Sequence, residues 1–287
     1  MKITRYKKYG IEFDESEIEL PKVIRVNDLK IKPSKLIPRL IKKGINLKKI
    51  PYLPLGYEIE SEFSPASTTE HLLGYYYIQE TASQLPVVSL NPLPGQSVLD
   101  MAASPGSKTT QIGQMMKNQG VIIALDNHTI RAKKLVNNLM RIGIENNAVY
   151  IKDARYASDL GKFDKVLLDA PCSGNYCIEP NYYNKRSIED IKNKAQTQKE
   201  LLQEAIRSTK KGGVIVYSTC SLEIEENEEV ILSALETKKV ELQDTNLKTG
   251  TPGFAIQGIK ELKKTKRMWP HIHKTQGFFI AKLIKTK

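Results

Sequence analysis

Between residues 97 and 236 the chain alternates short apolar runs with longer segments in which apolar residues recur every three or four positions. The apolar runs predict buried β-strands, and the periodic segments predict amphipathic helices that cover them. Strands without polar alternation are buried on both faces, which indicates a doubly wound (Rossmann-like), mainly parallel α/β sheet. We expect strands at 97–102, 120–126, 147–151, 163–170 and 214–220, and helices at 107–118, 128–143, 187–213 (with a glycine stop) and 225–236.

The first 90 residues follow a different pattern, with mixed β-branched and polar positions and several prolines. Pro38 lies within the first helical pattern and is expected to limit its first turn. The proline- and glycine-rich segment 91–95 is a boundary signal, and we expect a small α+β domain with its linker over residues 1–85 and a catalytic domain over residues 86–287. In order, we expect a strand, a helix, a strand interrupted by prolines, a loop and a helix, at residues 23–31, 33–44, 47–60, 64–70 and 75–90.

The charge of the chain is unevenly distributed around a net value of +12. Residues 1–50 contain 14 Lys and Arg against 6 Asp and Glu, whereas residues 51–95 contain 5 Glu and no Lys or Arg. A basic face favours a polyanionic partner, nucleic acid first, although a lysine-rich solvated surface is the alternative. Tyr52 and Tyr57, near the basic segment, are candidates for stacking on RNA bases.

The three cysteines, Cys172, Cys177 and Cys220, are an odd number, which argues against a disulfide framework and favours a reducing, cytoplasmic setting. No signal peptide and no membrane-spanning apolar run is recognised. Cys172 and Cys177 nominally have a zinc-ligand spacing, with His271 and His273 as distant further candidates. A second cysteine pair is missing, so we expect no metal. We take a monomer as the default oligomeric state.

Polar or reactive residues follow the end of every predicted strand, where α/β sheets bind their ligands. The turn AASPGSKT at 102–109 has small residues that let a backbone approach a ligand, but it matches neither the dinucleotide nor the nucleoside triphosphate fingerprint. Asp126 can accept hydrogen bonds from ribose hydroxyls or cap the next helix, and Asp153 can accept from an adenine amino group or cap a turn. An adenosine site without a phosphate loop suggests S-adenosylmethionine as cofactor.

Two of the cysteines lie at the same set of strand ends and suggest a particular methyl transfer. Carbon 5 of cytosine reacts poorly with a sulfonium methyl group, but a thiolate that adds to carbon 6 makes carbon 5 reactive. An acid near ring nitrogen 3 assists the addition, and a base must later remove the proton from carbon 5. Cys220, Asp169 and Cys172 are the candidates for these tasks. Methylation of a small molecule or protein is the alternative chemistry.

At these residues the chain resembles the Nop2/Sun family of RNA cytosine-5 methyltransferases. The segments DMAASPGSKT, DAPCSG and STCS resemble signature blocks of the family, and YYIQETAS and RMWPHIHKTQGFFIAKL resemble flanking ones. One departure is Ser107, which stands where the family usually has a second glycine. The compact form is most similar to the archaeal tRNA cytosine-5 methyltransferases. The resemblance therefore implies RNA as substrate, tRNA before rRNA, with a non-catalytic RNA-binding assembly factor as a further alternative.

The resemblance also implies roles for single residues of the predicted catalytic centre. It implies that Cys220 is the nucleophile, that Cys172 acts in release of the methylated product, and that Asp169 faces both the cytosine ring and the cofactor. The segment RVNDLKI near the N-terminus resembles part of a small RNA-recognition-like domain.

For the cofactor, the resemblance implies a ribose contact for Asp126, an adenine contact for Asp153 and a cofactor-side position for Arg131. S-adenosyl-L-methionine would also contact Asp169. The methionine-side loop would consist of Ala102, Ala103, Ser104, Pro105, Gly106, Ser107 and Lys108.

Overall fold

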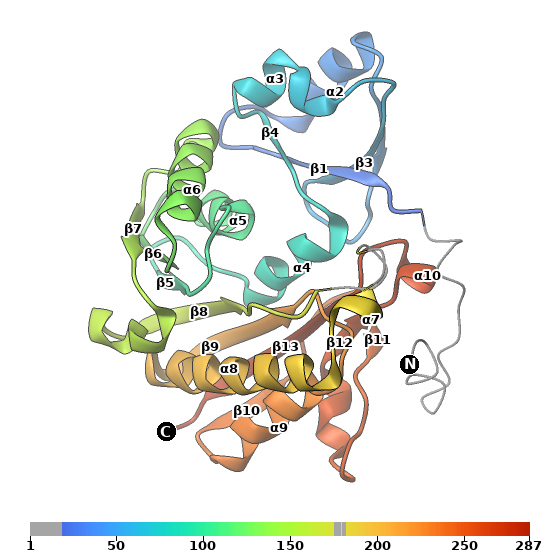
Figure 1. The fold of residues 1–287 in the computed structure, drawn as a ribbon. Coiled ribbons are helices and arrows are strands. Elements are labelled where there is room, and N and C mark those ends of the chain that lie inside the picture. The colour runs from blue at the N-terminus through green and yellow to red at the C-terminus, as the bar shows by residue number, and fades with distance from the viewer. Residues whose placement is uncertain (1–18, 175–178, 180–181) are drawn as a thin grey trace.

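The computed structural model describes residues 19–174, 179 and 182–287, so Cys177 and the first 18 residues lie outside the described part of the chain. In this part no helix is both long and apolar enough to cross a membrane. Figure 1 shows a small sheet with its helices at the top and a larger sheet with helices on both faces below it.

The small sheet is antiparallel and has the strand order β2-β3-β1-β4. Leu36 and Leu40 of the helix α2 are buried against Ile24 and Val26 of the sheet. Pro38 was expected to limit the first turn of this helix, but α2 continues through it. The burial of Leu36 and Leu40 against the sheet explains why the helix tolerates the proline. The elements are β1 (Lys22–Val26), α2 (Pro33–Lys42), β2 (Asn46–Lys49), β3 (Gly56–Glu60), η2 (Pro65–Ser67), α3 (Thr69–Leu72) and β4 (Tyr76–Ile78).

Two local predictions for this region are wrong. The segment 64–70, expected to be a loop, contains the short helical turns η2 and the start of α3. The expected helix at 75–90 is divided, because its aromatic start pairs with β1 as strand β4 and only Thr81–Leu90 forms the helix α4. Helix α4 begins here because the Glu80 carboxylate accepts hydrogen bonds from the backbone amides of Ala82 and Ser83, as a capping residue does.

The large sheet has the order β11-β12-β13-β9-β8-β5-β6-β7, with β10 paired to β13. The five strands from β7 to β9 are parallel, as expected, and β13 adds antiparallel to β9. The predicted doubly wound α/β class is confirmed. The strands are β5 (Ser97–Asp100), β6 (Val121–Asp126), β7 (Asn147–Ile151), β8 (Phe163–Asp169), β9 (Thr209–Thr219), β10 (Val240–Gln243), β11 (Thr251–Pro252), β12 (Lys266–Met268) and β13 (Phe278–Lys285).

Neighbouring residues of one strand belong to two different cores, one on each face of the large sheet. Val98 and Val216 pack with α4, α5 and α6, whereas Leu99 and Tyr217 pack with α8 and α9 on the other face. Figure 1 shows these two helical layers. The remaining helical segments are α5 (Ser107–Met115), α6 (Thr129–Ile142), η3 (Ala154–Leu160), α7 (Tyr182–Lys185), α8 (Ile188–Arg207), α9 (Glu228–Glu236), η4 (Lys260–Lys264) and α10 (Pro270–His273).

Helix α8 ends at Arg207, before the glycines that were expected to stop it. Gly212 and Gly213 lie inside strand β9. A Cβ atom on Gly213 would lie 2.9 Å from the carbonyl oxygen of Lys210 and 3.0 Å from that of Asp164. The glycine therefore permits a close backbone approach in the sheet and is not a helix terminator.

Arg25 of β1 joins the small sheet to the helix that follows the turn 102–109. Its buried guanidinium donates to Gln114 Oε1 (3.0 Å), Thr110 Oγ1 (2.8 Å) and the carbonyl oxygen of Ser107 (2.9 Å), and also to Gln79. Three of these four acceptors belong to α5. The small sheet thus fixes the first turn of α5, which is the end that faces the candidate active site.

Candidate active site

The candidate residues predicted from the sequence meet at the carboxyl edge of the parallel strands. Asp126 is the last residue of β6, Asp169 the last residue of β8, and Cys220 follows β9 directly. Residue Asp169 is in register with Ser218 of β9. Cys172 follows Asp169 by three residues and Cys220 follows Ser218 by two, so the loops after two adjacent strands bring the thiols together.

The Sγ atoms of Cys172 and Cys220 are in direct contact and form a thiol pair. Both cysteines are free and partly buried. This pair is the strongest chemical feature of the site, because one thiol can act as a nucleophile while the other exchanges protons at the same carbon–carbon bond of a substrate.

Asp169 is held in a fixed orientation beside the thiols. Its Oδ2 accepts a hydrogen bond from Lys108 Nζ (2.7 Å), and its Oδ1 accepts one from Ser218 Oγ (2.7 Å). Burial lowers the pKa of Lys108, but Asp169, Asp100 and Cys220 together raise it above its ordinary value. Lys108 is therefore a buried cation that faces both Asp169 and Cys220.

Sequence reasoning gave Lys108 only a place in the cofactor loop and did not identify Ser218. The serine stands two residues before Cys220 in an apolar strand, and its polarity inside such a strand was the available signal. Its partner could be recognised only from the register between β8 and β9.

The small-residue turn enters α5 through Gly106, which has a φ of +106° and is the N-cap of the helix. A Cβ atom at this position would lie 3.0 Å from Leu135 Cδ1, so glycine suits both the conformation and the packing. Ser104 Oγ is buried and has no hydrogen-bond partner among the described residues. An unsatisfied buried hydroxyl of this kind fits a ligand contact.

Asp126 offers a second unsatisfied atom. Its Oδ1 accepts a hydrogen bond from the backbone amide of His128 (2.9 Å). Its buried Oδ2 accepts no hydrogen bond among the described residues and has only an ion-pair contact with Arg131 Nη2, at 3.1 Å. The free lone pairs fit the hydroxyl donors of a ribose, as expected for an adenosine cofactor.

Asp153 lies after β7 and its carboxylate is already engaged. It caps η3 by accepting from the backbone amide of Arg155 (2.9 Å), and it pairs with the Arg155 guanidinium at 2.7 Å. Arg155 lowers the pKa of Asp153 through these contacts. In this structure Asp153 therefore caps a turn, as one of the two alternatives predicted. Its contact with adenine stays a prediction.

The structure also bears on the expected RNA stacking of Tyr57 and on the candidate metal ligands. Tyr57 is buried in the core of the small sheet, and Lys49 Nζ covers its ring at 4.6 Å, so its proposed stacking on RNA bases is wrong. Among the described residues no group of three or more His, Cys, Asp and Glu side chains could hold a metal ion.

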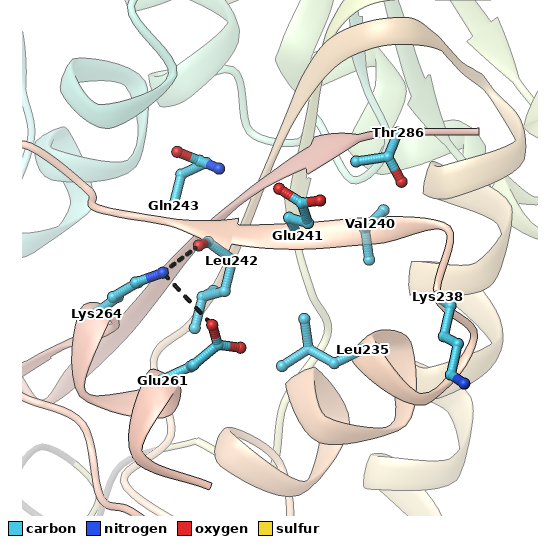
Figure 2. Close-up of a pocket in the computed structure, with 9 residues that line it drawn as sticks. All are labelled: Leu235, Lys238, Val240, Glu241, Leu242, Gln243, Glu261, Lys264 and Thr286. Carbon is cyan, nitrogen blue, oxygen red and sulfur yellow. Dashed lines mark hydrogen bonds and ion pairs between the residues drawn. The ribbon is translucent and has the colours of Figure 1, made fainter.

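A cavity of about 320 Å³ lies between α9, β10 and η4, and Figure 2 shows its lining. Its Lys264 Nζ already donates to the carbonyl oxygen of Leu242 (3.1 Å) and pairs with Glu261. Strand β10 pairs with the carboxyl-terminal half of β13. That half lies beside Val214 of β9, which precedes Cys220 by six residues. The cavity is therefore at the opposite edge of the sheet from Cys220, and we do not assign it to the active site.

Comparison with known families agrees with this geometry. The family model for 16S rRNA methyltransferase RsmB/F matches residues 87–284, and the model for the N-terminal domain of 16S rRNA methyltransferase RsmF matches residues 7–81.

Two curated relatives illustrate the range of substrates in their names. The 28S rRNA (cytosine-C(5))-methyltransferase of Mus musculus is 41% identical over 294 residues, which cover 96% of this chain and 36% of that protein. The tRNA (cytosine(72)-C(5))-methyltransferase of Pyrococcus horikoshii is 40% identical over 215 residues, which cover 75% of this chain and 53% of that protein. The chain spans between 36% and 47% of the length of the first two curated relatives.

Two crystal structures from Pyrococcus horikoshii are similar over almost the whole chain. A methyltransferase homolog protein has a TM-score of 0.86 and 43% identity, and the similarity covers 94% of this chain and 88% of that one. NSun6 with SFG has a TM-score of 0.85 and 30% identity, and the similarity covers 95% and 93% of the two chains.

Proposed function

This chain belongs to the 16S rRNA methyltransferase RsmB/F family, of the Nop2/Sun type that its motifs indicated, and we propose that it methylates carbon 5 of cytosine in RNA. The observation that carries the proposal is the Cys172–Cys220 thiol pair together with the ion pair of the buried Lys108 and the partly buried Asp169. A methyltransferase for a small molecule or protein needs no such thiol pair, and a non-catalytic assembly factor needs neither pair.

The cofactor of this family is S-adenosylmethionine, which supplies the methyl group. We propose that Asp126 binds its ribose through the unsatisfied Oδ2, with Arg131 alongside, and that Asp153 binds on the adenine side. Asp169 is bonded to Lys108, which also interacts with Cys220, and we propose that it faces both cofactor and cytosine. The methionine side would lie against the turn made by Ala102, Ala103, Ser104, Pro105, Gly106, Ser107 and Lys108.

In the proposed reaction Cys220 Sγ forms a bond to carbon 6 of the cytosine ring. Carbon 5 would then take the methyl group from the sulfonium sulfur of S-adenosylmethionine, which would leave as a neutral thioether. A base, for which Asp169 and Cys172 are the candidates, would take the proton of carbon 5. The electron pair of that C–H bond then expels the sulfur from carbon 6, which restores the aromatic ring and frees Cys220. Lys108 holds its positive charge beside Cys220. Cys172 lies within contact of Cys220 and serves the release step.

We propose tRNA as the substrate, in line with the similarity to the archaeal tRNA enzyme. The relatives named as rRNA enzymes favour rRNA as the second candidate. In the proposed organisation residues 1–85 recognise RNA and residues 86–287 carry catalysis, with α4 spanning the boundary. We further propose that the protein acts as a monomer in the cytoplasm.

The catalytic assignment is tested by two alanine variants. Cys220→Ala should abolish methylation and any covalent RNA adduct, because the bond to carbon 6 cannot form. Cys172→Ala should instead accumulate enzyme on RNA, visible as a slower band on denaturing gels, because release is blocked. Normal methylation by Cys220→Ala, or no adduct with Cys172→Ala, would refute the respective role.

The substrate assignment is tested separately from the catalytic one. The enzyme is incubated with labelled cofactor and with separated tRNA and rRNA pools, and nucleosides are analysed by mass spectrometry. Labelled 5-methylcytidine in the tRNA pool alone is the expected result. Label confined to rRNA would replace tRNA by the second candidate.

A further inference from the structure

Glu226 is a fully buried carboxylate in the loop between Cys220 and α9, and the reaction outlined above gives it no role. Its oxygens accept hydrogen bonds from the backbone amide of Ser173 (2.9 Å) and from Ser173 Oγ (3.0 Å). Ser173 directly follows Cys172. The Glu226 side chain also has a hydrogen bond with the side chain of Ser221, which directly follows Cys220. A buried carboxylate is costly to keep unless it is hydrogen-bonded, so its placement beside the residues that follow the two cysteines is a specific feature of the fold.

The backbone on both sides of Cys172 is held by buried side chains. On one side, Gln198 Nε2 of α8 donates to the carbonyl oxygen of Pro171 (2.9 Å). On the other side, Ser173 is bound by Glu226 and by the hydroxyl of Tyr182. Glu226 is itself fixed, because Tyr217 OH donates to its backbone carbonyl oxygen (2.6 Å). The sulfur of Cys172 is thereby directed at Cys220.

The two thiols have neighbours of opposite charge. Cys220 interacts with the ammonium group of Lys108, which is paired with Asp169. Cys172 interacts with the carboxylate of Glu226. An anion favours the neutral form of a thiol beside it, so Glu226 favours the neutral form of Cys172, whereas the charged neighbour of Cys220 is a cation.

We propose that Glu226 is a positioning residue that fixes Cys172 against Cys220 and keeps Cys172 as the neutral thiol of the pair. The proposal deepens the function proposed above and rests on its assignment of Cys220 as nucleophile. The neutral thiol can hydrogen-bond to the Cys220 thiolate without competing with it for carbon 6.

Other charged and titratable groups around the pair do not reverse the effect of Glu226 on Cys172. The hydrogen bond with Cys220, burial, and the charges of Cys220 and Glu226 all raise the pKa of Cys172. Arg186 is the cation that interacts with Cys172 among the described residues, and it is ion-paired with Glu179 at 2.8 Å. The other groups facing Cys172 or Glu226 are Glu223, Tyr182 and Tyr217.

The test uses alkylation by iodoacetamide, which reacts with the thiolate and needs neither RNA nor cofactor. In a chain in which Cys177 and Cys220 are replaced by serine, Cys172 is the one remaining thiol. Its labelling rate is measured by mass spectrometry at about pH 8 and about pH 10. The rate at about pH 10 is divided by the rate at about pH 8, which cancels differences in the access of the reagent. For a thiol that stays mostly neutral, the thiolate fraction rises tenfold per pH unit, so this ratio approaches one hundred.

We expect the ratio for Glu226→Gln to be at least about threefold lower than the parent ratio, because the amide keeps an acceptor for Ser173 but removes the charge. Glu229→Gln is the matched control, with the same change three residues away, and should keep the parent ratio. An unchanged ratio in Glu226→Gln would overturn the proposal.

A second comparison does not depend on the folding of a Glu226 variant. At about pH 7.5, the chain with Cys220 as its one thiol should be alkylated at least tenfold faster than the chain with Cys172 alone, although both cysteines are similarly exposed. Equal rates would refute the assignment of Cys172 as the neutral thiol of the pair. Failure of either experiment leaves the covalent trapping with Cys172→Ala as an independent test of the proposed function.

Discussion

The buried ion pair between Arg267 and Glu228 lies beside the loop that carries Cys220, and removal of one partner should destabilise the fold. Arg267 of β12 donates from Nε to Glu228 Oε1 (2.7 Å) and from Nη1 to the carbonyl oxygen of Leu222 (2.9 Å), and both charged residues are fully buried. Leu222 follows Cys220 by two residues. The pair therefore ties the active-site loop to the antiparallel edge of the sheet.

Replacement of Arg267 by methionine leaves the Glu228 carboxylate buried and without its cation. Removal of one partner from a buried ion pair costs about 3–5 kcal/mol of unfolding free energy. For a domain of roughly 150–250 residues, about 1 kcal/mol shifts the melting temperature by about 2–4 °C, so we expect a decrease of about 6–20 °C.

Differential scanning calorimetry of Arg267→Met measures the decrease, and two variants make the result specific. Lys48→Met breaks the exposed pair with Glu58, and such pairs contribute about 0–1 kcal/mol. Adding Glu228→Gln to Arg267→Met should recover part of the loss, because the amide removes the charge and still accepts from the Phe254 amide. If Arg267→Met melts within 2 °C of Lys48→Met, by the same conversion of about 2–4 °C per kcal/mol, the reasoning is refuted.

Three further predictions concern the cofactor, pH and RNA. Asp126→Ala should weaken S-adenosylmethionine binding at least about tenfold, with RNA affinity unchanged, because a charged acceptor of hydrogen bonds is lost; equal affinities by isothermal titration calorimetry would contradict the ribose assignment. Burial raises the pKa of Asp100 from 3.8 to about 6. The folded protein then binds this proton more tightly than the unfolded chain, so the stabilising contribution is complete below about pH 4 and lost as the pH rises to about 6. The melting temperature of Asp100→Asn should vary less than that of the parent across this range, and parallel profiles would exclude the raised value. RNA affinity should fall steeply with salt, and a flat dependence in filter binding would contradict a basic RNA face.

The sequence was sufficient for the five parallel strands of the large sheet, because they are continuous apolar runs separated by helices that are amphipathic over several turns. The four antiparallel strands β10 to β13 were not predicted. The sequence also failed for Tyr76–Ile78, since a strand of three residues has no usable period and is formed by pairing with β1, far earlier in the chain. Tyr57 was misjudged for a related reason, because burial in the small core depends on contacts with α2 and β1.

The catalytic centre could be predicted only as far as its residues follow strand ends. Cys220 and Asp169 stand at chain positions marked by the pattern itself. Glu226 and Ser173 are 53 residues apart, and their hydrogen bonds require the loops after β8 and β9 to adopt one particular arrangement. Neither residue type nor local spacing encodes that arrangement. From the sequence, Glu226 therefore could not be distinguished from the other acidic residues near the start of the helix α9.

The meeting of the two thiols depends on one register, that of Asp169 with Ser218. Successive side chains of a strand point to opposite faces, so a slip of one residue would turn Ser218 away from Asp169 and move Cys220 along the strand direction by about 3.3 Å. The Lys108–Asp169–Ser218 chain of hydrogen bonds would then be broken together with the thiol contact. Strand β13 pairs with Ser218 and Thr219 from the other side, through Ile280 and Phe279, and so fixes β9 along the same residues. The antiparallel strands that end the chain therefore stabilise the register on which the proposed chemistry depends.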